Sequence, residues 1–274
     1  QVLSQDNSRI IHAYSSTAEH YWQGWYSGQK SDHLKPANSS IISEFGAQAL
    51  PDLTTLKNFI PPADLWPKTT DKKDEGWRIW AYHNFQPHET FELAKVTRGP
   101  NISTFIKNSQ QYQASLIQLA AESYRRQRYQ PVAALFHFMF TENWPSINWG
   151  IVDYLRHPKP GYFALQQAYQ PVLPSIEPKT ENWVQGQTGR IGLWAINDNW
   201  HDYPQASLHW KILQSGMTLS EGVQDINLTA DSGLKVIELQ VIPRSAETIK
   251  VISDILNHQG AVLGHNELQL YVQP

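Results

Sequence analysis

The sequence contains no cysteine among its 274 residues. This absence excludes disulfide bonds, thiolate catalysis and cysteine-ligated zinc, and it favours a reducing compartment such as the cytoplasm. No hydrophobic run approaches the roughly 18 residues of a membrane span. The 22 basic and 25 acidic residues nearly balance, so the clustered basic face that nucleic-acid binding needs is not indicated. We therefore expect neither a membrane nor a nucleic-acid partner.

Aromatic residues are abundant, with 11 tryptophans and 12 tyrosines. Aromatic side chains at this density often line sites that stack on flat apolar faces, such as the face of a sugar ring, but they are also good core formers. The length indicates about two domains. Composition alone therefore leaves a sugar site and an ordinary core as alternatives.

A proline-rich joint at Pro171, Pro174 and Pro178 divides the chain into two parts with different hydrophobic periodicity. Before it, apolar runs at 39–43 and 132–140 predict strands, and residues 110–128 and 162–169 have helical spacing. Strands that alternate with helices predict a parallel α/β sheet, either doubly wound or a barrel. The span 58–99 predicts a long loop with short helices beside a site.

After the joint, apolar residues alternate with polar ones, as in Leu208, Trp210 and Ile212. This period of two predicts an antiparallel sandwich of about 95 residues. We place the domains at residues 1–175 and 176–274. The basic run at 124–128 is expected to be a solvated helix end.

Glu44 ends the apolar segment Ile41-Ile42-Ser43-Glu44-Phe45-Gly46. If the strand continued, it would bury an unpaired carboxylate at a cost of several kcal/mol. A position at the carboxyl end of a parallel strand avoids this cost, because such folds open into a pocket there. Glu44 is therefore a candidate catalytic carboxylate, and the alternative is a carboxylate paired with an arginine at the strand end.

Two further segments place aromatic residues next to polar ones. The run from Phe136 to Pro145 ends an apolar strand with Glu142 and Trp144, which would share a rim with Glu44 if the two strands are neighbours. The cluster His20-Tyr21-Trp22 precedes a loop. Each segment could form a wall of a sugar subsite or simply pack in the core.

The segment Ser43-Glu44-Phe45-Gly46-Ala47-Gln48, followed by Leu50-Pro51, resembles the nucleophile segment of glycoside hydrolase family 2, in particular its β-mannosidase-like branch. Further motifs resemble that family in the same order: Asp6-Asn7-Ser8-Arg9, Ser15-Ser16, His20-Tyr21-Trp22, residues 135–154, residues 158–165 and residues 193–198. The resemblance implies an α/β plus all-β fold. Its parts are a partial (β/α)8 TIM barrel, comprising strands 5–8, and a following immunoglobulin-like β-sandwich.

By this resemblance Glu44 takes the role of nucleophile, which forms a glycosyl-enzyme that water releases with retention of configuration. The resemblance also implies sugar contacts for a group of ring side chains: His20, Tyr21, Trp22 and Trp144. For His20 the contact would be with a sugar hydroxyl, or the ring would orient Glu44. Glu142 stands where relatives often carry Asp, so the motif departs from the family pattern and its role stays open.

The family's general acid/base is a glutamate preceded by asparagine at the end of the fourth barrel strand. A complete barrel needs about 250 residues, whereas about 170 precede the expected sandwich here. The only Asn-Glu pair, Asn266-Glu267, lies in that sandwich. We therefore expect the C-terminal fragment of a retaining, exo-acting β-glycosidase that is inactive or very weak alone. The motifs favour a β-mannoside, with β-galactosidase, β-glucuronidase or exo-glucosaminidase specificity as alternatives.

Half a barrel would expose strand edges. We expect self-association, pairing with a complementary N-terminal half, or a segment 58–99 that packs over the gap. Three rival hypotheses remain: Glu142 replaces the missing acid, the chain is a non-catalytic carbohydrate-binding module, or it is a structural remnant. The histidines show no metal-ligand spacing, so no metal or other cofactor is expected.

Overall fold

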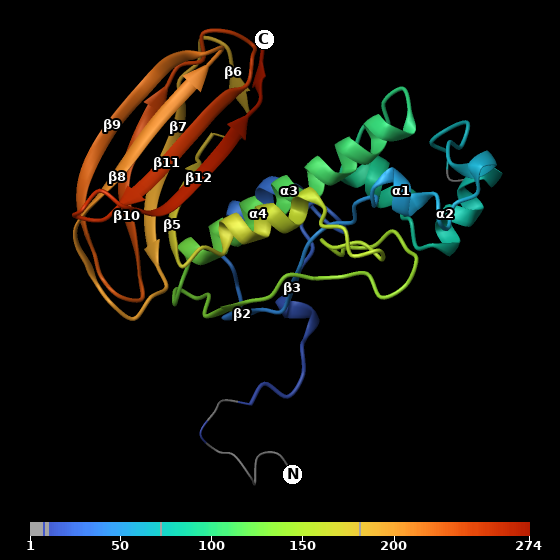
Figure 1. Cartoon of the computed structure of the whole chain (residues 1–274), viewed down its shortest axis with the longest axis horizontal. Helices are drawn as coiled ribbons and strands as arrows, with labels where there is room; N and C mark the ends of the chain where they lie inside the picture. Colours follow the sequence, from blue (N-terminus) through green and yellow to red (C-terminus); the bar gives the residue numbers. More distant parts are fainter. Residues whose placement is uncertain (1–7, 9–10, 72, 181) are drawn as a thin grey trace.

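The computed structural model describes residue 8 and residues 11–71, 73–180 and 182–274. The expected motif residues Asp6, Asn7 and Arg9 lie outside this part of the chain. Long antiparallel strands form one end of the molecule, and helix α3 (Ile102–Arg126) extends from them toward a group of short helices at the other end (Figure 1). Within the described ranges, no helix has the length and apolarity to cross a membrane.

Four short strands pair in parallel beside α3. Strand β1 (His20–Tyr21) pairs with β3 (Glu44–Phe45), and β2 (Ile41–Ile42) pairs with β4 (Ala134–Leu135), both in parallel. Because only Ser43 separates β2 from β3, the spatial order is β1, then β2 with β3, then β4. The predicted parallel arrangement is present, although the strands are shorter than predicted. No closed barrel forms among the described residues.

Helix α3 begins earlier than predicted. The Asn101 side chain accepts a hydrogen bond from the Thr104 backbone amide at 2.9 Å and thereby caps the helix. Helix α4 (Pro160–Ala168) has proline in its first turn, where the missing amide proton costs no hydrogen bond. One face of α3 packs on α4 and on the parallel strands around Phe45, Ile117 and Tyr124.

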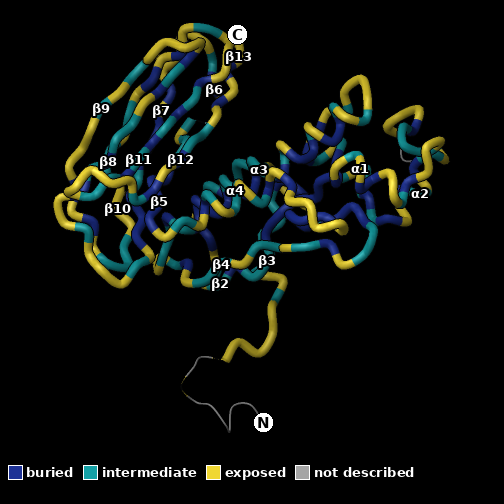
Figure 2. The backbone as a smooth tube through the Cα atoms, in the orientation of Figure 1, coloured by how far each residue is buried: buried dark blue, intermediate teal, exposed yellow. Residues whose placement is uncertain are grey.

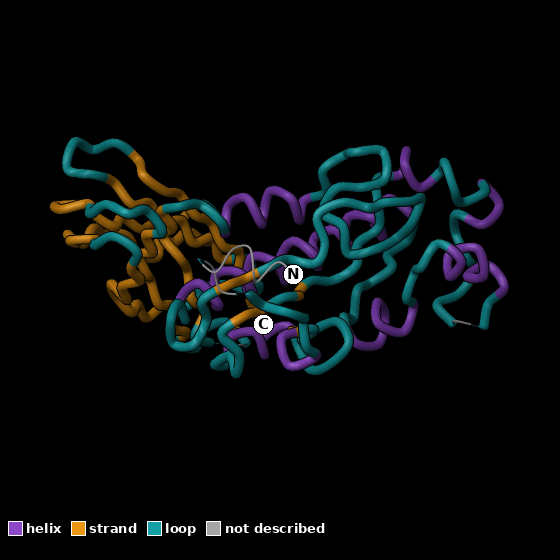
Figure 3. Tube along the Cα trace, turned by 90° about the horizontal axis from the view of Figure 1, so that it is seen from below, coloured by secondary structure: helices purple, strands orange, loops and turns teal. Residues whose placement is uncertain are grey.

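Two antiparallel sheets make up the C-terminal part. One contains β10 (Ser232–Val241), β7 (Gly189–Asn197) and β5 (Val172–Pro178), in that order, and the other contains β12 (Val262–Leu270), β11 (Ile249–Leu256), β8 (Tyr203–Gln214) and β9 (Met217–Leu228). Alternate residues such as Leu208 and Ile212 point into one core between the sheets, as the period of two predicts. Short strands β6 (Trp183–Val184) and β13 (Val272–Gln273) pair beside them. Figure 3 shows the strands gathered at one end.

The predicted boundary between residues 175 and 176 falls inside β5, and the division into two domains stays a prediction. The predicted solvated basic run is wrong. Arg126 is buried and its Nη1 donates to Ser175 Oγ of β5 at 2.6 Å, while Arg125 and Arg128 bind Asp198 at 2.7 and 2.6 Å. These arginines fasten the end of α3 to the antiparallel sheets because the sheets cover the helix end.

The span 58–99 forms short helices, as predicted. They include two 3₁₀ turns (Pro62–Asp64 and Glu75–Trp77), α2 (Arg78–Tyr82) and a π turn (Glu89–Leu93), and α1 (Leu53–Leu56) precedes them. Trp80 and Phe85 pack on Phe105 of α3, and Trp77 packs on both of them. Together they form a second core, seen as buried chain at that end of Figure 2. This core lies at the end of α3 far from β4 (Figure 2).

A buried histidine holds the loop after β1 against α3. His33 lies in the 3₁₀ turn Lys30–Leu34, with Nε2 donating to the Gln23 carbonyl at 2.9 Å and Nδ1 lying 2.6 Å from the Tyr124 hydroxyl. Burial lowers the pKa of His33 to about 4. The neutral ring satisfies both bonds, because one nitrogen donates and the other accepts.

Candidate active site

Glu44 is the first residue of β3 and lies near the carboxyl end of the extended segment 41–45, opposite His20 in the register of β3 and β1. Its Oε2 is 3.6 Å from His20 Nδ1, and the two side chains are 26% and 24% exposed. In the ranges that the structure describes, His20 is the only ion-pair partner of Glu44. The alternative of a carboxylate paired with an arginine is therefore not supported there, and the carboxylate retains some exposed surface.

A serine bridges His20 to the strand that carries Glu44. Ser15 Oγ is 2.9 Å from His20 Nε2 and 2.6 Å from Ser43 Oγ, and the Ser43 amide donates to the Glu19 carbonyl at 3.0 Å. Because one ring nitrogen is held by Ser15, the other is directed toward Glu44. Ser15 belongs to a family-like motif in the sequence, but its role could not be predicted, since only the fold brings it beside Ser43.

Gly46 and the segment that follows β4 form the base of the site. A Cβ at Gly46 would lie 2.3 Å from the Phe138 carbonyl oxygen and 3.3 Å from His137 Nε2, so only glycine permits this approach. The Phe138 amide donates to the Phe45 carbonyl at 3.0 Å. Burial, aided by the positive charge of Lys159, lowers the pKa of His137 to about 3, so this ring is neutral.

Trp22 lies at the carboxyl end of β1 in a cluster of rings. Its ring centroid is 5.5 Å from that of Tyr26, 5.7 Å from that of Phe138 and 5.8 Å from that of Trp149. Trp22 and Tyr26 both retain exposed surface. Because successive strand residues point to opposite faces, Trp22 and His20 share the side that carries the candidate nucleophile.

Tyr21 points to the other side of β1. Its hydroxyl accepts hydrogen bonds from the Asn38 and Ser39 amides at 2.8 and 3.1 Å, and its ring packs edge-on against Tyr124 at 5.4 Å. These contacts hold the loop before β2. The expected sugar contact of Tyr21 stays a prediction, and its hydroxyl is already engaged with the backbone.

Glu142 is fully buried and is bound to Lys159, whose Nζ lies 3.2 Å from Oε1. Ser146 Oγ donates to its other oxygen at 3.3 Å, and Lys159 also donates to the Ala49 carbonyl at 2.9 Å. These contacts fit an ion pair that fixes the loop before α4. The roles considered for Glu142, a sugar contact or a replacement acid, stay predictions that would require this buried pair to open.

Trp144 lies on that same loop, against the segment 58–99. Its ring stacks on His83 at 5.7 Å and meets Tyr82 edge-on at 6.1 Å. The described contacts of Trp144 thus join it to residues that the sequence placed in a long loop beside a site. Its expected sugar contact stays a prediction.

Glu19 is a further acidic residue beside the site, because its backbone carbonyl accepts a hydrogen bond from the Ser43 amide. Partial burial works to raise the pKa of Glu19, but hydrogen bonds from His12 and the Ser16 amide outweigh it and the pKa falls. A lowered pKa suits a carboxylate that stays ionised rather than an acid that donates a proton. Among the described residues, no cluster of three or more histidine and acidic side chains could hold a metal ion.

No protein-family model matches the chain. Curated relatives include a protein named β-mannosidase B from Emericella nidulans, 23% identical over 227 residues, and another from Aspergillus niger, 26% identical over 194 residues. These alignments cover 77% and 65% of this chain but only 26% and 22% of the relatives. The chain therefore spans about a quarter of the length of the curated relatives it matches.

Among solved structures, a β-D-mannosidase from Dictyoglomus thermophilum superposes with a TM-score of 0.71 at 20% identity, covering 92% of this chain and 30% of that one. An exo-chitosanase from Amycolatopsis orientalis superposes with a TM-score of 0.63 at 14% identity, covering 88% of this chain and 29% of that one. These findings confirm the resemblance, predicted from the motifs, to the C-terminal portion of β-mannosidase-like members of glycoside hydrolase family 2.

Proposed function

We propose that this chain is the nucleophile-bearing portion of a retaining β-glycosidase that acts on β-mannosides. The observation that carries the proposal is the placement of Glu44, which is partly exposed near the carboxyl end of the extended segment 41–45 and faces a histidine rather than a lysine or arginine. Carboxyl ends of parallel strands are where barrel enzymes hold their catalytic residues. The β-mannoside is supported by the names of the relatives.

We propose that the architecture has the same origin. Strands β1, β2 with β3, and β4 correspond to three of the four strands expected for the second half of a (β/α)8 barrel, with α3 and α4 as its helices. The two antiparallel sheets represent an immunoglobulin-like sandwich that follows it. The fold similarity to the Dictyoglomus thermophilum enzyme supports both assignments, since it covers 92% of this chain.

In the proposed reaction, a Glu44 oxygen attacks the anomeric carbon and the bond from that carbon to the leaving oxygen breaks. Water then attacks the same carbon, releases the sugar and restores the carboxylate. The Ser15–His20 pair orients the carboxylate, and Trp22 supplies an apolar wall for the sugar ring.

Retaining hydrolysis also needs a second carboxyl group about 5–5.5 Å away that donates a proton to the leaving oxygen. The acidic residues described near the site do not suit this role, because Glu142 is buried in an ion pair and the pKa of Glu19 is lowered. We infer that the proton donor comes from another part of the enzyme. The chain alone should then act only on substrates whose leaving group departs without a proton.

Chemical rescue of Glu44→Ala tests this proposal with 2,4-dinitrophenyl β-mannoside, whose phenolate leaves unassisted. Glu44→Ala should lower release about 10³-fold or more, and added azide should restore it with formation of an α-mannosyl azide. The control Glu221→Ala removes a carboxylate that is 62% exposed and should change nothing. Sugar binding without turnover or rescue would contradict catalysis and favour a carbohydrate-binding module.

A further inference from the structure

Tyr26 adds a polar group to the aromatic cluster around Trp22. The Tyr26 ring centroid lies 5.5 Å from that of Trp22 and 6.1 Å from that of Trp149, and Tyr26 is 42% exposed. Trp22 is the residue that the proposed reaction uses as an apolar wall for the sugar ring. A sugar presents an apolar face and a rim of hydroxyl groups, so a phenol beside that wall has the chemistry to bind the rim.

Gln86 fixes how the Tyr26 hydroxyl is hydrogen-bonded. It lies in the segment 58–99, between α2 and the π turn, and its Oε1 accepts a hydrogen bond from Trp25 Nε1 at 2.9 Å. An indole N–H can only donate, and Trp25 is 1% exposed, so the amide oxygen of Gln86 has to face Trp25. The amide nitrogen therefore faces the Tyr26 hydroxyl and donates to it at 2.8 Å.

The Tyr26 hydroxyl keeps its own proton for another acceptor, because a phenol can accept and donate at the same time. Burial, aided by the negative charge of Glu89, raises the pKa of Tyr26, although the hydrogen bond from Gln86 acts to lower it. The hydroxyl is therefore protonated at neutral pH. Within the described ranges no side chain or carbonyl accepts this proton, so it is available to a ligand.

The backbone around Gln86 is tied to the segment that follows Glu44. Gln48 is 3% exposed, its Nε2 donates to the Asn84 carbonyl at 2.9 Å, and its Oε1 accepts from the Gln86 amide at 3.3 Å. Both ends of one buried side-chain amide thus hold residues 84–86 beside the chain that leads away from the candidate nucleophile. The position of Gln86 relative to Glu44 is therefore fixed by hydrogen bonds.

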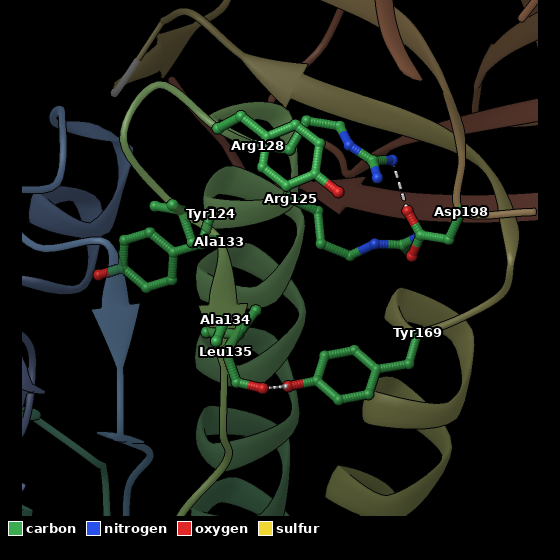
Figure 4. Close-up of a pocket in the computed structure, with 10 residues that line it drawn as sticks. Tyr124, Arg125, Arg128, Ala133, Ala134, Leu135, Tyr169 and Asp198 are labelled. Atoms are coloured by element: carbon green, nitrogen blue, oxygen red, sulfur yellow. Dashed lines mark hydrogen bonds and ion pairs between the residues drawn. The ribbon is translucent and has the colours of Figure 1, made fainter. Parts of the chain in front are cut away.

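A cavity of about 270 Å³ at the end of α3 lacks this arrangement (Figure 4). The Tyr169 hydroxyl there donates to the Leu135 carbonyl at 3.2 Å, and Arg125 and Arg128 both bind Asp198. The phenol proton and the guanidinium groups of this cavity are thus already engaged within the chain. Because Tyr169 is 38% exposed, close to the value for Tyr26, it is a matched comparison for that residue.

We propose that Gln86 is a positioning residue of the sugar site, which holds the Tyr26 hydroxyl so that it donates a hydrogen bond to a hydroxyl group of the bound β-mannoside. This inference rests on the proposed function and gives the segment 58–99 a part in it. Gln86 does not contact the sugar itself, because it acts through Tyr26. A directed donor beside an apolar ring fixes the orientation of the ligand that it binds.

Exchange of the Gln86 amide for a carboxylate tests the proposal. Gln86→Glu keeps an acceptor for Trp25 but removes the donor, so the carboxylate takes the Tyr26 proton, which it binds more strongly than a sugar hydroxyl does. Calorimetry with methyl 1-thio-β-mannoside, whose sulfur link resists hydrolysis, should show about tenfold weaker binding in Gln86→Glu and in Tyr26→Phe. The double variant should bind no more weakly than Tyr26→Phe, because Gln86 acts only through the hydroxyl.

Two control variants make the same chemical changes elsewhere. Tyr169→Phe removes a phenol hydroxyl that is engaged with the backbone, and Gln187→Glu adds a negative charge at an exposed glutamine. Both should leave the affinity for the thiomannoside unchanged. Urea midpoints of all variants, measured in the same buffer, separate a loss of affinity from a loss of folding.

Unchanged affinity in Gln86→Glu or in Tyr26→Phe, or losses that add in the double variant, would overturn the positioning role and leave the proposed function intact. Failure of the unaltered chain to bind the thiomannoside would overturn both. Turnover of the dinitrophenyl β-mannoside is measured with the same samples. Its absence, together with the expected losses of affinity, would refute catalysis and leave the positioning role intact.

Discussion

The buried pair of Glu142 and Lys159 predicts a large loss of stability when only one partner is removed. The side chains are 0% and 1% exposed, and Lys159 also donates to the Ala49 carbonyl. Lys159→Met leaves the buried carboxylate without its counter-charge, which typically costs about 3–5 kcal/mol of unfolding free energy. For a chain of this size that loss lowers Tm by about 10 °C.

Urea unfolding followed by tryptophan fluorescence and circular dichroism measures this loss. The double variant Glu142→Gln/Lys159→Met should recover most of it, because it buries no unpaired charge. Lys211→Met is the matched control, since Lys211 pairs with Glu221 on the surface and its loss should cost about 1 kcal/mol or less. A loss below about 1 kcal/mol in Lys159→Met would refute the structural role of this pair and reopen Glu142 as a site residue.

Three further predictions concern the site and its support. The pKa of His33 is about 4 in the folded chain and ordinarily 6.5. Below pH 6.5 the unfolded chain therefore binds a proton that the folded chain does not. The free energy of unfolding should be at its full value above pH 6.5 and fall by up to about 1.4 kcal/mol per pH unit below it. Urea titrations at pH 7 and 5 check this, and an equal slope in His33→Gln would contradict it. Gly46→Ala should lower the free energy of unfolding by about 1–3 kcal/mol, because the added Cβ would meet the Phe138 carbonyl oxygen at 2.3 Å. The control Gly233→Ala, whose Cβ would have no neighbour closer than 3.4 Å, should cost less. Equal urea midpoints for the two variants would count against the close approach at Gly46. Ser15→Ala should lower kcat for the dinitrophenyl β-mannoside about tenfold with little change in KM, because His20 loses its support; a change confined to KM would argue for a direct sugar contact instead.

Much of the fold follows from the sequence. The period of two after the proline joint predicted the antiparallel sheets, since Leu208 and Ile212 point into their common core. The start of α3 was missed, because the residues before 110 are less regular in pattern and the Asn101 cap is a single residue. The parallel strands are short, and their pairing depends on contacts between segments far apart in the chain, such as Ile42 with Leu135.

The candidate site was predicted in part. The position of Glu44 at a strand end followed from the cost of burying its carboxylate, and the register places His20 opposite it. The buried ion pair of Glu142 could not be predicted, since Lys159 is 17 residues away and meets it only in the folded chain. The arginines after Tyr124 read as a solvated helix end because the sequence does not reveal that Asp198 and Ser175 would cover them.

Covalent trapping tests the central claim most directly. The chain is incubated with 2,4-dinitrophenyl 2-deoxy-2-fluoro-β-mannoside, digested and examined by peptide mass spectrometry. The account predicts one fluorosugar adduct on the peptide that contains Glu44, and none in Glu44→Gln. An adduct on another carboxylate, or turnover of 2,4-dinitrophenyl β-mannoside without any adduct on Glu44, would contradict it.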